Sequence, residues 1–130
     1  MKITSNFSLR EFRCKDGTDV PDELRDNLKG LCENLQRLRD KIGRPVHIVS
    51  GYRTESYNKR VGGVKRSQHL KAKAADLRVS GMTTRELHAE IIKLIRAGEM
   101  DPGGVGLYSS FVHYDTRGRN ARWYGRGMRP

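Results

Sequence analysis

Two histidines and two aspartates lie at spacings from which three of the side chains could hold one metal ion. His69 precedes Asp76 by six intervening residues, and small alanines lead into the strand expected to carry Asp76. His113 and Asp115 lie two positions apart in another expected strand, so their side chains point to the same face of a sheet. Two imidazoles and one carboxylate make a three-ligand set for catalytic zinc, with a fourth position open for water.

Other interpretations of these histidines remain open at this point. Nitrogen and oxygen ligands without thiolate also permit other divalent metals. Alternatively, His69 and His113 are two unrelated surface histidines, because short motifs often match by chance. The sequence predicts simpler roles for the other two histidines. His88 falls in a polar stretch of an expected helix and should lie at the surface. His47 falls in an expected strand and should be a hydrogen-bonded structural residue.

Two long helices and a set of short strands are expected to position these residues. Leucines at helical spacing predict a helix over residues 21–42, which begins with a proline and two acids and ends at Gly43. A capping box at Thr83 predicts a second helix, whose inward-facing residues are Leu87, Ile91, Leu94 and Ile95. A short helix is expected from Ser8 and a helical turn over residues 54–60. Short strands are expected at residues 46–49, 74–79, 105–108, 111–115 and 121–124. This order of elements predicts an α+β fold.

Composition limits the class of protein. The chain has 130 residues, and we expect one domain over residues 1–130. Its 26 lysines and arginines exceed its 15 acidic residues by 11, so the net charge is +11. That charge favours polyanionic partners, which include nucleic acid, anionic membrane surfaces and anionic polymers of a bacterial cell wall. No apolar run approaches the roughly 20 residues of a membrane span, which excludes a transmembrane protein.

The two cysteines do not predict a metal site. Cys14 and Cys32 lack the spacing of zinc-binding pairs, and Cys32 falls on the apolar face of the first expected helix, as a buried thiol would. A disulfide between them stays open. The first residues lack the apolar core of a secretory signal, so we expect synthesis in the cytoplasm.

Three motifs occur in a fixed order along the chain. They are Ser50-Gly51-Tyr52-Arg53, then Ser67-x-His69-x6-Asp76, then a late His113. In this order they resemble the zinc D-alanyl-D-alanine carboxypeptidase family, which includes phage endolysins and shares its fold with the hedgehog signalling domain. The resemblance covers nearly the whole chain and is strongest from Ser50 to Trp123. It implies a hedgehog/DD-peptidase type of α+β fold, with helices packed on a small antiparallel sheet.

The resemblance implies a zinc centre and a substrate site. One Zn²⁺ per chain would be bound by His69, Asp76 and His113, where it would activate a water molecule and polarise the scissile carbonyl. Arg53 matches the family arginine that holds a carboxylate or carbonyl group of the substrate, a task suited to the planar fork of a guanidinium. The residues expected to line the substrate site beside it are Tyr52, Ser67 and Gln68.

One departure from the family pattern concerns the general base. Many members carry a glutamate or histidine two or three residues before the third ligand, where this chain has Ser110 and Phe111. Asp115 is the nearest acidic candidate, either as the general base or as the group that orients the zinc-activated water. The alternative is that Asp115 positions a ligand histidine.

The leading hypothesis is a zinc peptidase that hydrolyses an amide bond in peptidoglycan stem peptides. A carboxypeptidase and an endopeptidase are both compatible with the residues. The alternative is a non-catalytic, zinc-containing binding module of the same fold. The expected partner is peptidoglycan, with anionic wall polymers as further candidates and with neither nucleic acid nor a membrane. We expect a monomer that acts at the cell wall or in the periplasm after release, in the manner of a phage lysin.

Overall fold

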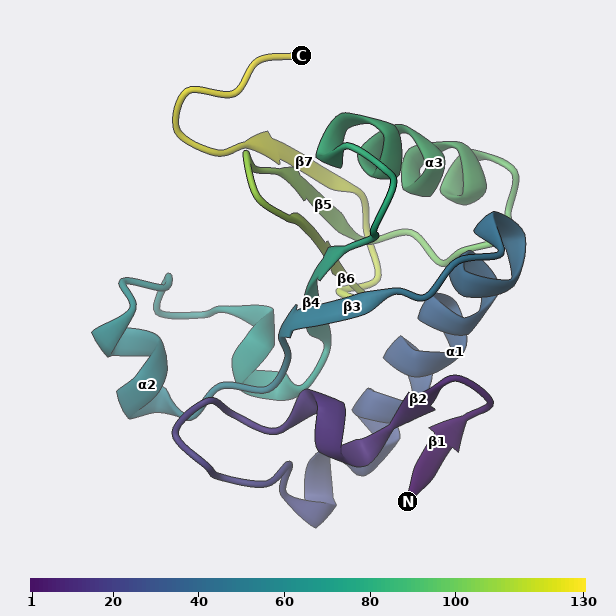
Figure 1. Cartoon of the computed structure of the whole chain (residues 1–130). Helices are drawn as coiled ribbons and strands as arrows, with labels where there is room; N and C mark the ends of the chain where they lie inside the picture. The colour runs from purple at the N-terminus through teal and green to yellow at the C-terminus, as the bar shows by residue number, and fades with distance from the viewer.

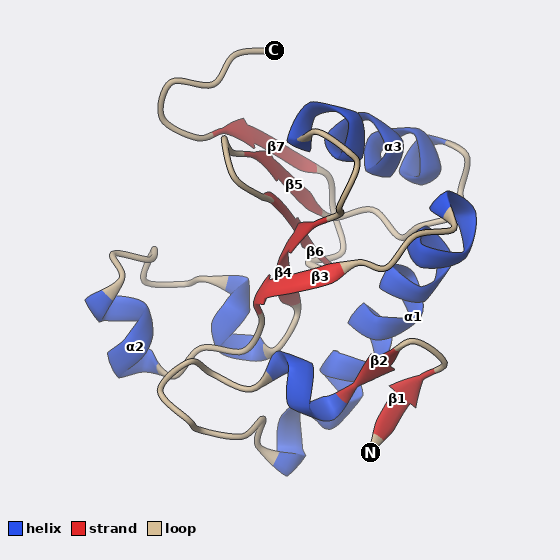
Figure 2. Cartoon of the chain, viewed as in Figure 1, coloured by secondary structure: helices blue, strands red, loops and turns tan.

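A five-stranded sheet forms the centre of the fold (Figures 1 and 2). The computed structural model describes all 130 residues. The strands, in their order across the sheet, are β3 (His47–Ser50), β4 (Ala74–Arg78), β6 (Val112–Asp115), β5 (Gly104–Leu107) and β7 (Ala121–Tyr124). All neighbours are antiparallel except β5 and β7, which run parallel. The last strand therefore adds beside β5 rather than continuing the meander next to β6.

Two long helices cover the sheet. They are α1 (Arg25–Ile42) and α3 (Thr84–Arg96), and Figure 1 shows them near each other, away from the short α2 (Glu55–Arg60). The N-terminal region adds a small hairpin of β1 (Lys2–Thr4) and β2 (Phe7–Ser8), followed by a 3-10 helix at Leu9–Phe12. Further 3-10 helices occupy Asp22–Leu24 and Gln68–Lys71. None of the helices has the length and apolar character that a membrane crossing requires.

Side-chain alternation along the central strands separates a core face from a polar face. Leu77 of β4 and both Val112 and Tyr114 of β6 are completely buried in the hydrophobic core, together with residues of α1 and α3. Because successive side chains of a strand point to opposite faces, Asp76 and His113 lie on the other face. The sheet thus supplies a rigid, core-backed platform for polar residues.

Most elements confirm the sequence-based expectations, and the fold is α+β with a largely antiparallel sheet. Three differences stand out. The helix expected over residues 21–42 begins with a 3-10 turn, and its α-helical part begins at Arg25. The strand β7 pairs in parallel, so the sheet is not wholly antiparallel. His47 is exposed and makes no side-chain hydrogen bond, so its expected structural role is wrong, because its side chain points to solvent near the sheet edge.

The apolar face of α1 is a main contributor to stability, and we expect Leu35→Ala to lower the free energy of unfolding by about 2–5 kcal/mol. Leu35 is completely buried in the core, so its truncation leaves a cavity. Denaturant-induced unfolding measures the loss. Glu33→Ala, at an exposed position of the same helix, is the matched control and should change the unfolding midpoint little. Equal effects of the two substitutions would contradict this assignment of the core.

Candidate metal centre and substrate cleft

The polar face of the sheet carries one transverse row of directly paired residues. Ser50 pairs with Asp76, Asp76 with His113, His113 with Gly106, and Gly106 with Trp123. The row therefore crosses all five strands and brings together residues that are far apart in sequence. Because cross-strand partners lie about 4.5–5.5 Å apart, the backbone register alone places Asp76 and His113 side by side.

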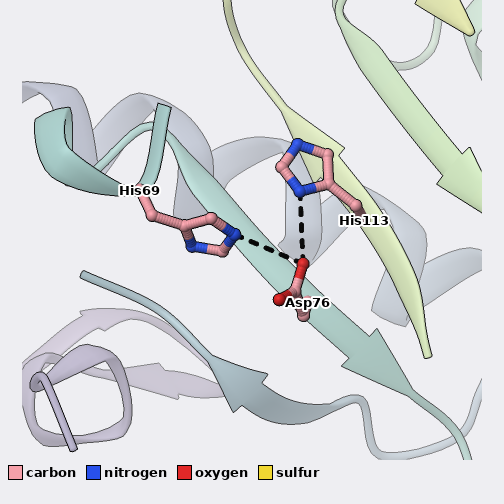
Figure 3. Close-up of side chains that lie close together, drawn as sticks. All are labelled: His69, Asp76 and His113. Atoms are coloured by element: carbon pink, nitrogen blue, oxygen red, sulfur yellow. Dashed lines mark hydrogen bonds and ion pairs between the residues drawn. The ribbon is translucent and has the colours of Figure 1, made fainter. Parts of the chain in front are cut away.

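His69 reaches this row from the 3-10 helix Gln68–Lys71 (Figure 3). Its Nε2 atom lies 3.3 Å from Oδ1 of Asp76, and Nδ1 of His113 lies 3.2 Å from the same oxygen. The three side chains can each offer one ligand atom, with all three atoms within 4.8 Å of one another. All three residues are buried, with exposed fractions of 3–8%.

The remaining nitrogen of each histidine is fixed by a hydrogen bond to an acceptor. Nδ1 of His69 donates to the carbonyl oxygen of Gly51 at 2.7 Å, and Nε2 of His113 donates to Oδ2 of Asp115 at 2.7 Å. A carbonyl oxygen can only accept, so the proton of a neutral His69 lies on Nδ1. His113 faces a carboxylate on each side, and its shorter contact, 2.7 Å to Asp115 against 3.2 Å to Asp76, places the proton of the neutral ring on Nε2. The inner nitrogens of both histidines then present lone pairs toward Asp76.

This arrangement fits a metal cation. Two nitrogen lone pairs and a carboxylate oxygen face one another at hydrogen-bond distance, and such acceptors repel unless a positive charge lies among them. The hydrogen bonds to Gly51 and Asp115 are of the kind that orient histidine ligands in metal sites. Nitrogen and oxygen donors in a set of three suit Zn²⁺ with an open fourth position, so His69, Asp76 and His113 fit zinc.

The backbone around His69 is tied down at several points. The Ser67 hydroxyl accepts from the amide of His69 at 3.2 Å, and the carbonyl of His69 accepts from the amide of Arg53 at 3.0 Å. Gly51 lies directly against the backbone of Phe12, where a Cβ atom would approach Phe12 Cα to 2.8 Å. Glycine at position 51 therefore lets the Ser50–Arg53 turn pack close enough to supply the carbonyl that holds His69.

Asp115 is completely buried behind His113 and is saturated with hydrogen bonds. Besides His113, its carboxylate accepts from Nε and Nη2 of Arg117 at 2.9 and 2.8 Å, and from the backbone amides of Gly104 and Arg117. Burial alone would raise the pKa of Asp115, but the hydrogen bonds from His113 and Arg117 outweigh it and hold that pKa well below its usual range. Asp115 is therefore a fixed anion that orients His113.

In both Asp76 and His113, burial and the neighbouring groups shift the pKa in opposite directions. Burial raises the pKa of Asp76, but the close approach of His113 and His69, which favours a positive charge beside the carboxylate, outweighs it and keeps that pKa far below its usual value. Burial lowers the pKa of His113, but the carboxylates of Asp115 and Asp76 on either side of the ring favour its protonated form, outweigh burial and raise that pKa. Both directions express the same fact, that the pocket stabilises a positive charge beside Asp76.

A cleft of about 560 Å³ opens over the side chains of His69, Asp76 and His113. Arg53 forms part of its wall, and each nitrogen of the guanidinium has one partner. Nη2 donates to Oδ2 of Asp76 at 3.3 Å, Nη1 to Oδ1 of Asn58 at 3.1 Å, and Nε to the hydroxyl of Ser50 at 3.4 Å. The guanidinium is thus held next to the metal ligands with its charge facing the cleft. Asp76 is the only carboxylate among the lining residues.

An aromatic wall closes the opposite side of the cleft. Trp123 donates its indole N–H to the hydroxyl of Tyr108 at 2.9 Å, and the ring of Tyr108 stacks on Phe111 with centroids 4.4 Å apart. The Trp123 ring lies 5.0 Å from the ring of His113 and 5.1 Å from the guanidinium carbon of Arg117. This packing requires a glycine at position 106, because a Cβ atom there would overlap the indole.

The structure brings most of the expected site residues together. The three expected metal ligands form the floor of the cleft, and Arg53, Ser67 and Gln68 line it. Tyr52 does not line the cleft: it packs against the core, because adjacent residues of the extended turn point to opposite sides. Asp115 lies behind His113 and does not line the cleft either.

Several lining residues were not expected from the sequence. They are Arg66, Arg117 and Phe111, which line the cleft beside Tyr108 and Trp123, two aromatic residues within the span of the family resemblance. Arg117 continues the alternation of His113 and Asp115, so the period-two pattern contained a signal for it. The aromatic residues carried no such signal, because their meeting depends on how β7 joins the sheet.

Comparison with known proteins gives two matches. Residues 3–115 match the model of the peptidase M15 family. A probable peptidoglycan L,D-endopeptidase, MepK, of Haemophilus influenzae is 35% identical over 128 residues, which cover 92% of this chain and 62% of the relative. The chain thus spans less than two thirds of the length of that relative. The family match includes all three expected metal ligands.

Proposed function

The chain belongs to the peptidase M15 family, and from that premise we propose that it is a zinc-dependent peptidase of peptidoglycan stem peptides. The observation that carries the proposal is the convergence of His69, Asp76 and His113 at the floor of a cleft, with both histidines fixed by outer hydrogen bonds. The similarity to a probable peptidoglycan endopeptidase supports peptidoglycan as the substrate. Both carboxypeptidase and endopeptidase activity fit this proposal.

The proposed zinc site uses the three side chains that already converge. A bound Zn²⁺ would supply a Lewis acid for the scissile carbonyl and a water molecule that ionises near neutral pH. The chain contributes the two inner nitrogens and one oxygen of Asp76, and the cleft leaves the remaining side of the site open. Asp115 positions His113 rather than removing a proton from the attacking water, because its carboxylate is buried and fully engaged.

The side chains along the walls of the cleft would bind the substrate. Arg53 would hold a carboxylate or carbonyl group of the peptide, because its guanidinium is fixed beside Asp76 and faces the cleft. Arg66 adds positive charge to the same cleft, whereas the charge of Arg117 is paired with Asp115. A positive cleft suits peptides rich in carboxylates. Ser67 and Gln68 complete the wall near His69.

The proposed partners follow from the same features. The metal ligands and Arg53 come from one chain, and we propose that the protein acts as a monomer. Its net charge of +11 favours retention on anionic polymers of the cell wall, where the substrate lies. Peptidoglycan, rather than nucleic acid, is the proposed partner because the metal ligands and Arg53 share one cleft.

A second candidate function is a zinc-containing binding module. One observation favours it: apart from Asp76, the residues that line the cleft include no carboxylate that could act as a general base. Such a module would bind zinc and peptidoglycan fragments without cleaving them. The two functions differ in one measurable respect, which is the release of product.

Incubation of the purified protein with peptidoglycan, followed by mass spectrometry of the soluble products, tests the proposal. We expect a released peptide that disappears when a chelator removes the metal and returns when zinc is added back. The mass of the fragment identifies the bond. Tight binding of one zinc per chain without any product would instead support the binding module, and product formation that persists in chelated, metal-free protein would contradict both.

A further inference from the structure

Asn58, in α2, is a buried polar residue that joins two parts of the cleft. Only 4% of the residue is exposed. Its Oδ1 atom accepts from Nη1 of Arg53 at 3.1 Å, and its Nδ2 atom donates to the carbonyl oxygen of Val64 at 2.9 Å. One side chain therefore connects the guanidinium of Arg53 to the segment that follows α2.

That segment, residues 61–66, forms a rim of the cleft. Four of its residues besides Arg66 line the opening, and Val64 has 73% of its surface exposed. The backbone carbonyl of Asn58 also accepts from the amide of Gly63 at 2.8 Å, and the carbonyl of Val64 accepts from the amide of Ser67 at 3.1 Å. Asn58 thus holds the rim by its backbone and by its side chain.

Gly63 is the position where the rim approaches Asn58 most closely. A Cβ atom there would overlap Oδ1 of Asn58 and come within 3.0 Å of Nη1 of Arg53. The backbone of Gly63 does not have the left-handed φ that favours glycine. Space, and not backbone conformation, therefore explains the glycine, and a single methyl group at this position would displace Asn58 from Arg53.

We propose that Asn58 is a positioning residue that fixes the guanidinium of Arg53 and the rim segment 61–66 in one arrangement, and thereby sets how tightly the cleft holds its peptide. The inference rests on the proposed function for the role of Arg53. Asp76 and Ser50 hold the other two nitrogens of the guanidinium, so loss of Asn58 frees Nη1 alone. The metal ligands keep their own hydrogen bonds to Gly51 and Asp115.

Asn58→Ala tests this role through steady-state kinetics on soluble muropeptides. We expect KM to rise about tenfold while kcat changes less than about twofold, because the lost contact orients a charged donor for binding. Zinc content should remain one per chain, since no metal ligand is touched. A fall in zinc content, or a loss in kcat at unchanged KM, would overturn the proposal.

Gly63→Ala provides an independent perturbation of the same contact. Alone, it should raise KM by a similar factor, and in the Asn58→Ala background it should add little, because the atom that it displaces is already absent. Gly30→Ala, in α1, is the matched control: a Cβ atom there meets nothing within 4 Å, and the kinetics should not change. Fully additive effects of the Asn58 and Gly63 substitutions would refute the shared contact.

A measurement without catalysis separates this proposal from the proposed function. Hydrogen exchange of the amides of Gly63 and Ser67 should become faster in Asn58→Ala and in Gly63→Ala, and equally fast in the double variant, because the rim loses its anchor. If the unmodified protein cleaves no peptidoglycan, the proposed function fails, and the exchange rates still decide on Asn58. Unchanged exchange in both single variants would overturn the anchoring role.

Discussion

Replacement of Asp76 with asparagine is expected to abolish zinc binding and to lower kcat/KM for peptidoglycan hydrolysis by at least about a thousandfold. Asp76 supplies the carboxylate oxygen that the inner nitrogens of His69 and His113 face. An amide has nearly the same shape but no charge, so the variant tests charge and coordination rather than packing. Metal-ion catalysis supplies several kcal/mol of transition-state stabilisation, and each 1.36 kcal/mol corresponds to a tenfold change in rate.

Metal analysis of the purified Asp76→Asn protein and activity assays with added zinc measure the two effects. Asp19→Asn is the matched control, because Asp19 is exposed and its carboxylate makes no hydrogen bond or ion pair. It should bind one zinc and retain full activity. Unimpaired hydrolysis by metal-free Asp76→Asn protein would show that the chemistry does not need this site.

Replacement of Asp115 with asparagine is expected to weaken zinc binding about 10–100-fold, as the loss of a group that orients a metal ligand does. The new amide can still accept from Gly104 and Arg117, but its NH₂ group would face Nε2 of His113. A neutral His113 then accepts at Nε2 and carries its proton on Nδ1, the nitrogen that points toward Asp76. That proton must be removed before a metal can bind.

Competition with a chelator measures the zinc affinity of the Asp115→Asn protein, and assays at saturating zinc measure its turnover. We expect the lower affinity to account for much of the lost activity, so that excess zinc restores part of it. If zinc affinity is unchanged and turnover is lost at every zinc concentration, Asp115 acts as the general base, the first of the two roles that the sequence left open.

The family resemblance predicted that His69, Asp76 and His113 would meet, and local geometry accounts for part of that prediction. His113 and Asp115 share a strand face through the period of two, and the His69–Asp76 motif spans a short turn into the next strand. The outer partner of His69 could not be predicted in this way. The carbonyl of Gly51 comes from a turn that is distant in sequence. Every residue has a backbone carbonyl, so the sequence does not indicate which one accepts this hydrogen bond.

The walls of the cleft could not be derived from the sequence for a different reason. Trp123 faces His113 only because β7 pairs in parallel with β5 across Gly106, and a meander of short strands predicts antiparallel neighbours instead. Asn58 appeared only as a polar residue of a short helix, and its contact with Arg53 depends on how the following rim folds back. The hairpin of β1 and β2 is too short to show alternation.

The transverse row also bears on the order in which the protein assembles. The paired residues Asp76 and His113 are 37 positions apart, and β7, the last strand of the chain, joins beside β5 at Gly106. Contacts of high sequence separation form late, because the entropy of closing long loops must be overcome first. A zinc ion at the proposed site would therefore find its three ligands together only after β4 and β6 have paired, and it would act mainly by stabilising the folded protein through mass action.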